Sequence, residues 1–202
     1  MLTERQSSDL VLAHFSCHGL KDDPGELYLA ATNTAPNRLA STAVDAALVS
    51  RLMQRSRARR VVLLLDCCYG AFERGVIARA GGDVDVSNQF TTGPLGGGRG
   101  RAIITASSAM EYAFEGARLA EDSVAQPSLF TAALVEGLTT GDADRDNDGH
   151  IALGELYDYV YDRVRERSPH QTPCKWEFGL QGELYLAAIP TAASCPDDSR
   201  PS

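Results

Sequence analysis

Short apolar runs, which predict strands, are interspersed along the chain with segments of helical apolar spacing. Short apolar runs predict strands at 10–15, 26–31, 61–65, 102–106 and 184–189. Apolar residues at helical spacing predict helices at 41–55, 129–138 and 153–164. The run at 61–65 is aliphatic throughout, which is typical of a central strand covered on both faces. This order of elements predicts an α/β fold in which helices flank a mostly parallel central sheet.

The spacing within 41–55 also predicts which side of that helix faces the core. Val44, Leu48 and Leu52 fall on one face of a helix. The Ser-Thr pair at the start of the segment is placed to cap its first turn, because these hydroxyls accept hydrogen bonds from free backbone N–H groups.

The length of 202 residues suits one domain, and the pattern above places it at residues 1–190. Two segments lack periodicity. Residues 80–100 are rich in glycine and polar residues, which predicts a long mobile loop. Residues 191–202 have the composition of a disordered tail.

Charge and cysteine content exclude several classes of function. The net charge of −8 and the pI of about 5.0 oppose binding to nucleic acid or to anionic membranes. No apolar run reaches the roughly 18 residues that span a bilayer, and the first residues are too polar for a signal peptide. We therefore expect a cytoplasmic protein, in which the five cysteines need not form disulfides. Their spacing matches no zinc site.

Two residues capable of nucleophilic catalysis follow predicted strands. His18 comes after the run at 10–15, and Cys68 comes after the run at 61–65. The carboxyl ends of parallel strands meet at one edge of a sheet, where sites gather. An imidazole there can take the proton of a thiol and later protonate a leaving amine. Gly19 has no side chain, so its backbone N–H can approach a developing oxyanion.

Four stretches resemble the caspase, metacaspase and paracaspase superfamily of cysteine peptidases. Phe-Ser-Cys-His-Gly at 15–19 resembles its His-Gly motif, and Leu-Leu-Leu-Asp-Cys-Cys-Tyr-Gly at 63–70 resembles its Asp-x-Cys-x-x-Gly motif. Ile-Thr-Ala-Ser-Ser-Ala-Met-Glu at 104–111 and Gln-Thr-Pro-Cys-Lys-Trp at 171–176 are similar to later segments of the bacterial members. The likeness covers residues 8–190, and a His-to-Cys separation of about 50 residues is that of caspases.

The resemblance implies a caspase-type three-layer sandwich and a role for each matched residue. Cys68 takes the nucleophile's position and His18 that of its base, and the backbone N–H groups of Gly19 and Cys68 form the oxyanion hole. The family fold begins with a strand and two helices ahead of the histidine strand, and this sequence starts after them. We therefore expect a domain that is incomplete at its N-terminus, with an open strand edge at 10–15.

The resemblance also implies a preference for basic substrates. Caspases that cut after aspartate carry Gln where this chain has Asp66, and a carboxylate there pairs with Arg or Lys and repels acidic side chains. Metacaspases and paracaspases use this Asp together with a Ser that matches Ser16, and Glu111 is a further candidate. The sequence thus predicts a cysteine endopeptidase that cleaves proteins or peptides after basic residues. The alternative for Asp66 is a structural carboxylate at a strand end.

A second motif matches the calcium loop of EF-hands. Carboxylates stand at positions 1, 3 and 5, glycine at 6, an aliphatic residue at 8 and glutamate at 12, a spacing that wraps one Ca²⁺. The candidate ligands are Asp144, Asp146, Asp148, His150 and Glu155. The alternative is an acidic turn that caps the following helix. The peptidase chemistry itself requires no cofactor.

Two other functions remain open at this point. One is a pseudo-peptidase that acts as a binding or scaffold module, and the other is a calcium-binding structural domain whose Cys-His pair is incidental. The sequence also leaves open a homodimer or fusion to partner domains.

Overall fold

The computed structural model describes residues 6–22, 24–68, 100–107 and 128–189, with the side chain of Cys68 outside this part. The strands are β1 (Leu10–Lys21), β2 (Leu27–Leu29), β3 (Val44–Asp45), β4 (Arg60–Cys68), β5 (Gly100–Thr105), β6 (His150–Ala152), β7 (Cys174–Phe178) and β8 (Tyr185–Ala188). The helices are the 3₁₀ turn η1 (Pro36–Arg38), α1 (Leu39–Thr42), α2 (Ala46–Arg55), α4 (Leu129–Thr140) and α5 (Leu153–Arg167).

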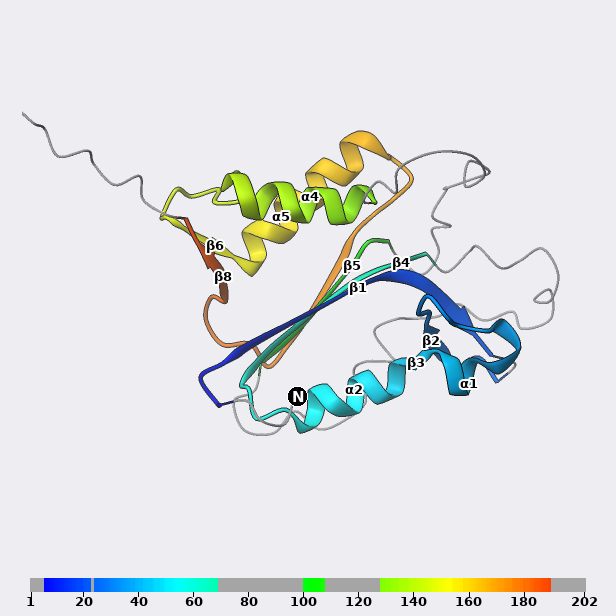
Figure 1. The fold of residues 1–202 in the computed structure, drawn as a ribbon. Coiled ribbons are helices and arrows are strands. Elements are labelled where there is room, and N and C mark those ends of the chain that lie inside the picture. The colour runs from blue at the N-terminus through cyan, green and yellow to red at the C-terminus, as the bar shows by residue number, and fades with distance from the viewer. Residues whose placement is uncertain (1–5, 23, 69–99, 108–127, 190–202) are drawn as a thin grey trace, which may run out of the picture.

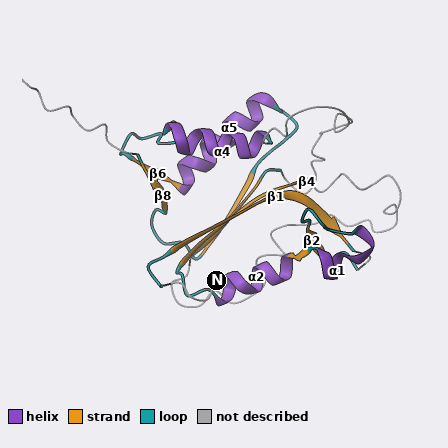
Figure 2. Cartoon of the chain, viewed as in Figure 1, coloured by secondary structure: helices purple, strands orange, loops and turns teal. Residues whose placement is uncertain are grey.

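A six-stranded sheet in the order β3-β2-β1-β4-β5-β7 forms the middle layer. Its centre is parallel, because β1 pairs with β4 and β4 with β5 in the same direction. Helices α4 and α5 cover one face of this sheet, and α1 and α2 lie on the other (Figure 1). Figure 2 shows the same layers by element type, with the β6–β8 pair beside α5. The predicted α/β sandwich is confirmed.

Strand β4 is buried on both faces, as its aliphatic run predicted. Each residue from Val61 to Leu65 is at most 3% exposed. Val62 and Leu64 pack into the cluster with α4 and α5, whereas Val61, Leu63 and Leu65 pack with α2. Burying each such side chain contributes about 1.5–3 kcal/mol to folding, so this strand anchors both layers and fixes where its carboxyl end lies.

Strand β1 is longer than predicted. The sequence predicted a strand at 10–15 with His18 after it, but β1 continues to Lys21 and His18 lies within it. Burial alternates along β1, so that polar residues on its exposed face are compatible with a strand. Val11, Phe15 and Cys17 lie on the other face and pack in the cluster with α2. Of the residues of β1, only 19–21 pair with β2. Between residues 10 and 17, no described strand lies on the side of β1 away from β4.

The helix predicted at 41–55 starts later and buries a different face. Asp45 is the N-cap of α2, and its Oδ1 accepts a hydrogen bond of 2.7 Å from the backbone N–H of Ala47. The buried stripe is Ala46, Val49, Ser50 and Met53. Val44 and Leu48, predicted to face the core, are 37% and 43% exposed. The prediction was wrong because Val44 precedes the helix, in β3.

Strand β7 was not predicted as a strand. Charged residues alternate with aromatic ones along it, and it pairs antiparallel to β5 at the edge of the sheet, where polar side chains are tolerated. None of the described helices is long and apolar enough to cross a membrane.

Gly137 allows α4 and α5 to pack closely. A Cβ atom at this position would lie 2.8 Å from Cδ1 of Tyr159 and 3.1 Å from the Cβ of Ala143. We expect Gly137→Ala to lower the free energy of unfolding by up to about 2 kcal/mol, since overpacking costs about 1–3 kcal/mol and the higher helix propensity of alanine returns only about 1 kcal/mol. Urea unfolding followed by circular dichroism measures this change.

Gly154→Ala in α5 is the matched control. Its Cβ would have only Lys175 Nζ within range, at 4.0 Å. We expect this variant to be at least as stable as the unchanged chain. Equal stability of the two alanine variants would contradict the close packing at Gly137.

Candidate functional site

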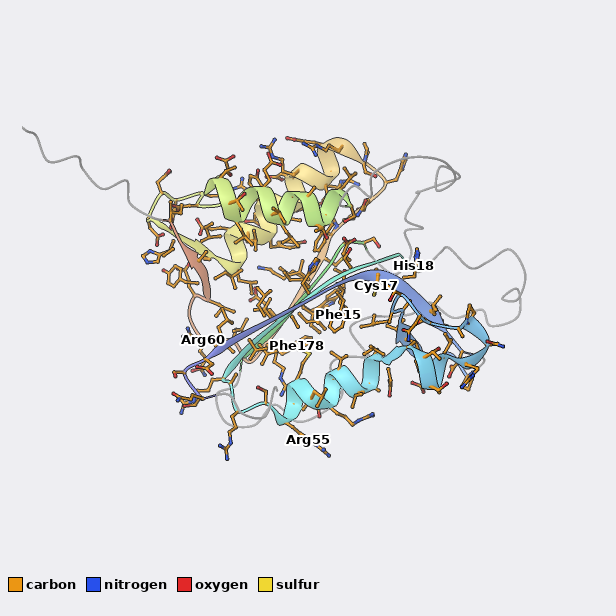
Figure 3. All side chains as sticks on the ribbon, viewed as in Figure 1. Phe15, Cys17, His18, Arg55, Arg60 and Phe178 are labelled. Atoms are coloured by element: carbon orange, nitrogen blue, oxygen red, sulfur yellow. The ribbon has the colours of Figure 1, made fainter. Side chains whose placement is uncertain are left out.

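The register of β1 on β4 brings the two predicted catalytic positions together. Ser16 pairs with Asp66, Cys17 with Cys67, and His18 with Cys68, all at the same offset of 50 residues. Figure 3 shows Cys17 and His18 toward the end of the sheet opposite to Arg60. The side chain of His18 is exposed. The backbone therefore brings positions 18 and 68 directly opposite each other on neighbouring parallel strands.

Asp66 is a buried carboxylate surrounded by hydroxyl groups. It is 5% exposed, and its Oδ2 accepts a hydrogen bond of 3.1 Å from the hydroxyl of Ser16. The hydroxyls of Ser128 and Thr131 donate to the same oxygen. Among the described residues, no basic side chain forms an ion pair with Asp66. The site thus holds a negative charge that hydroxyls stabilise and no described cation neutralises.

The N-terminus of α4 supplies two of these hydroxyls. Ser128 is the N-cap of the helix, and its Oγ accepts a 3.1 Å hydrogen bond from the backbone N–H of Thr131. The N-terminus of α4, which carries the positive end of the helix dipole, therefore lies beside Asp66. The Oγ1 of Thr131 also lies 3.2 Å from Nε2 of His14.

The backbone N–H of Gly19 is directed toward β4. The carbonyl of His18 accepts a 2.9 Å hydrogen bond from the N–H of Ala30, on the β2 side of β1. Successive residues of a strand direct their backbone groups to opposite edges. Gly19, the next residue, therefore points its N–H away from β2, toward the side on which β4 ends at Cys68.

The acidic loop at 144–155 brings three of its predicted ligands together. One carboxylate oxygen from each of Asp144, Asp146 and Asp148 lies within 4.8 Å of the others. The hydrogen bond from the N–H of Asp148 lowers the pKa of Asp146. Desolvation and the charges of Asp148, Glu155 and Asp144 raise this pKa by more than the hydrogen bond lowers it. The pKa of Asp146 is therefore raised, because neighbouring carboxylates lie close to it.

The other two predicted ligands lie outside this cluster. The Oε1 of Glu155 accepts hydrogen bonds from the N–H groups of Arg145 (2.8 Å) and Asp146 (3.1 Å). Its Oε2 accepts a 2.8 Å hydrogen bond from the N–H of Ala152. This bond caps the start of α5, as expected if the loop is an acidic turn that caps the following helix. The ring of His150 packs against that of Tyr185, with centroids 5.3 Å apart.

Several predictions lie outside the described residues: the Glu111 substrate contact, the loop at 80–100 except for Gly100, and the tail at 191–202. Conversely, the sequence analysis did not single out Ser128 and Thr131. The signal for Ser128 was a serine directly before a predicted helix, which is typical of an N-cap. Nothing in the sequence indicated that this cap contacts Asp66.

Comparisons with known proteins place this arrangement in a family. No curated protein matches the sequence. Among solved structures, the chain is similar to the crystal structure of protein GSU0716 from Geobacter sulfurreducens, with 13% identity and a TM-score of 0.49, over 86% of this chain and 67% of that one. The family profile described as caspase domain, of the peptidase C14 group, matches residues 2–185. Since this match spans most of the 202 residues, the chain belongs to the caspase domain family.

Proposed function

We propose that this chain is a cysteine endopeptidase that cleaves proteins or peptides after arginine or lysine, with Cys68 as nucleophile and His18 as base. The observation that carries the proposal is the parallel register that pairs His18 with Cys68, next to the buried carboxylate of Asp66. Residues two apart in a strand share a face. On this basis we assign His18, Ser16 and Asp66 to the face covered by α4.

In the proposed reaction the imidazole of His18 takes the proton of the Cys68 thiol. The thiolate attacks the carbonyl carbon of the scissile peptide, and the electron pair moves to oxygen. The N–H of Gly19, directed toward this end of β4, stabilises the oxyanion. The imidazolium then protonates the leaving amine, and water hydrolyses the thioester with His18 again as base. These steps require no cofactor.

The environment of Asp66 supports a preference for basic side chains. Its carboxylate is buried and lacks a described cationic partner, while hydroxyls occupy one of its oxygens. A guanidinium brought by the substrate would neutralise this charge through the other oxygen. An acidic side chain would meet a like charge at low solvent exposure. Nucleic acid and anionic membranes are disfavoured as partners by the net charge of −8.

The test is hydrolysis of fluorogenic peptides that end in Arg, Lys or Asp before the reporter, by the full chain and by Cys68→Ala. We expect hydrolysis of the Arg and Lys peptides only, and none by the variant. Cys67→Ala, which removes the neighbouring thiol in β4, is the matched control and should keep activity. A folded chain without activity on any peptide would favour the pseudo-peptidase alternative, and activity that survives Cys68→Ala would exclude Cys68 as nucleophile.

We also propose that the loop at 144–155 binds one Ca²⁺. The specific observation is the convergence of three carboxylates at EF-hand spacing, with a glycine at the sixth position that adopts a φ of 86°. Glu155 would complete the site by exchanging its hydrogen bonds with Arg145 and Asp146 for the ion. We leave the ring of His150 out of the proposed ligand set, since it packs on Tyr185.

Calcium binding predicts a ligand-dependent rise in thermal stability. At a Ca²⁺ concentration of about 100 times Kd, the folded state gains about 2.7 kcal/mol, which raises Tm by about 5–10 °C for a chain of this size. Differential scanning calorimetry with Ca²⁺ and with EDTA measures the shift. Asp144→Asn should remove it, whereas Asp142→Asn, an exposed aspartate just outside the loop, should keep it. An equal shift in both variants would contradict the site.

A further inference from the structure

A pair of thiols lies beside the proposed dyad and has no role in the reaction above. Cys17 precedes His18 in β1, and Cys67 precedes Cys68 in β4. The two residues are register partners, and their Sγ atoms are 3.5 Å apart. Both pack toward the α2 side of the sheet, the face opposite to that of Asp66.

The two thiols differ in reactivity. Cys67 is buried, at 3% exposure, whereas Cys17 is half-buried. The hydrogen bond from Cys67 lowers the pKa of the Cys17 thiol, and this outweighs the opposing effect of burial. The same pairing, with burial, raises the pKa of Cys67. The thiolate is the reactive form of cysteine. Cys17, which is more exposed and has the lower pKa, should therefore react with an oxidant first, and the protonated thiol of Cys67 lies next to it.

The backbone geometry allows these sulfurs to bond. Neighbouring strands lie about 4.8 Å apart, and disulfides join Cα atoms about 4.4–6.8 Å apart. The sulfurs need to close from 3.5 Å to a bond length of about 2.05 Å, which small side-chain rotations can supply. We infer that Cys17 and Cys67 are a redox-sensitive pair, which a peroxide converts to a reversible disulfide joining β1 to β4.

The chemistry balances with hydrogen peroxide as oxidant. The Cys17 thiolate attacks one peroxide oxygen, the O–O bond breaks, and the sulfenic acid forms while the other oxygen leaves as water after protonation. The sulfur of Cys67 then attacks the Cys17 sulfur. The S–S bond forms, the S–O bond breaks, and the hydroxyl leaves as water with the proton of Cys67. Two thiols lose two electrons, and one peroxide becomes two waters.

The disulfide would fix the spacing of β1 and β4 one residue before His18 and one residue before Cys68. Any effect of the disulfide on turnover rests on the proposed function, because the disulfide would act by holding His18 and Cys68 in one arrangement. The formation of the bond rests on the sulfur geometry alone. A chemical readout of the bond therefore stays informative whether or not the chain hydrolyses peptides.

The experiment treats the full chain carrying Cys68→Ala with hydrogen peroxide, alkylates the remaining thiols and digests the protein with trypsin. Cys17 then lies in peptide 6–21, and Cys67 in peptide 61–74, which in the unchanged chain also holds Cys68. Removing Cys68 therefore assigns the partner without ambiguity. We expect a linked pair of these two peptides, lighter by two hydrogen atoms than their sum, that dithiothreitol separates. The same pair should be absent from the Cys67→Ser/Cys68→Ala chain.

Three outcomes would overturn the inference. One is a folded Cys68→Ala chain in which both thiols remain free to alkylate after peroxide. Another is oxidation of Cys17 to sulfinic acid without linkage to Cys67. The third is equal linkage in urea, which would show that the folded register is not its cause. If Cys68→Ala fails to fold by circular dichroism, Cys68→Ser gives the same readout.

Discussion

His18→Ala is expected to lower kcat/KM for an arginyl peptide by about 10²–10⁴-fold, the usual contribution of a positioned acid–base group. Without the imidazole, only the spontaneously ionised fraction of the Cys68 thiol can attack. The residual rate should therefore rise about tenfold per pH unit below the pKa of an ordinary thiol, about 8.5. Initial rates measured between pH 6 and 9, roughly the range over which histidine and cysteine titrate, check both the loss and the slope.

His14→Ala provides the matched control for this prediction. His14 is also exposed and lies on the same face of β1, four residues before His18, but it contacts Thr131. We expect this variant to keep most of the activity and the pH profile of the unchanged chain. Equal losses in the two variants, or a His18→Ala rate that does not depend on pH, would argue against His18 as the base.

Asp66→Asn is expected to remove the preference for arginine. The substitution keeps the shape of the side chain and removes the charge that a substrate guanidinium would meet. Breaking a buried ion pair costs about 3–5 kcal/mol, so kcat/KM for the arginyl peptide should fall by about 10²–10⁴-fold. The citrulline peptide, a neutral isostere of the arginyl one, should change far less. The ratio of kcat/KM for the two peptides is the measurement.

Glu26→Gln controls for the general effect of charge. Glu26 is an exposed carboxylate just before β2, and its replacement removes one negative charge without touching the Asp66 network. The arginine-to-citrulline ratio should be unchanged in this variant. If a folded Asp66→Asn chain kept the ratio as well, Asp66 would be a structural carboxylate that holds Ser16 and the start of α4 in place.

The central layer was predictable because a strand that is buried on both faces consists of consecutive apolar residues. The aliphatic run in β4 predicts a strand buried on both faces, and Asp66 follows that run directly. β1 was predicted too short, since its second half alternates polar and small residues that resemble a turn. The burial of α2 was predicted wrongly for a similar local reason. Asp45 starts the helix later than the Ser-Thr pair suggested, which leaves Val44 outside it, and the helix packs on the sheet through Ala46, Val49 and Met53.

The candidate site was predictable only along the strands. The offset of 50 residues that separates His18 from Cys68 is also the register of β1 on β4, and it pairs Ser16 with Asp66 and Cys17 with Cys67 as well. The contacts of Asp66 with Ser128 and Thr131 depend instead on how α4 docks across the sheet. Docking of that kind is set by packing between distant segments, and no local pattern records it.

The side of β1 on which the described residues place no strand has a consequence for how the protein behaves in solution. The backbone groups of Leu12, His14 and Ser16 face the side on which no described strand lies, and Leu12 is 45% exposed. Such a row can template a strand from another copy. Mutual repulsion from the net charge of −8 opposes this contact at pH 7, but it fades near the pI of about 5.0. Light scattering should therefore show self-association growing as the solution is acidified, and Leu12→Lys should suppress it by adding a repelling charge to that row.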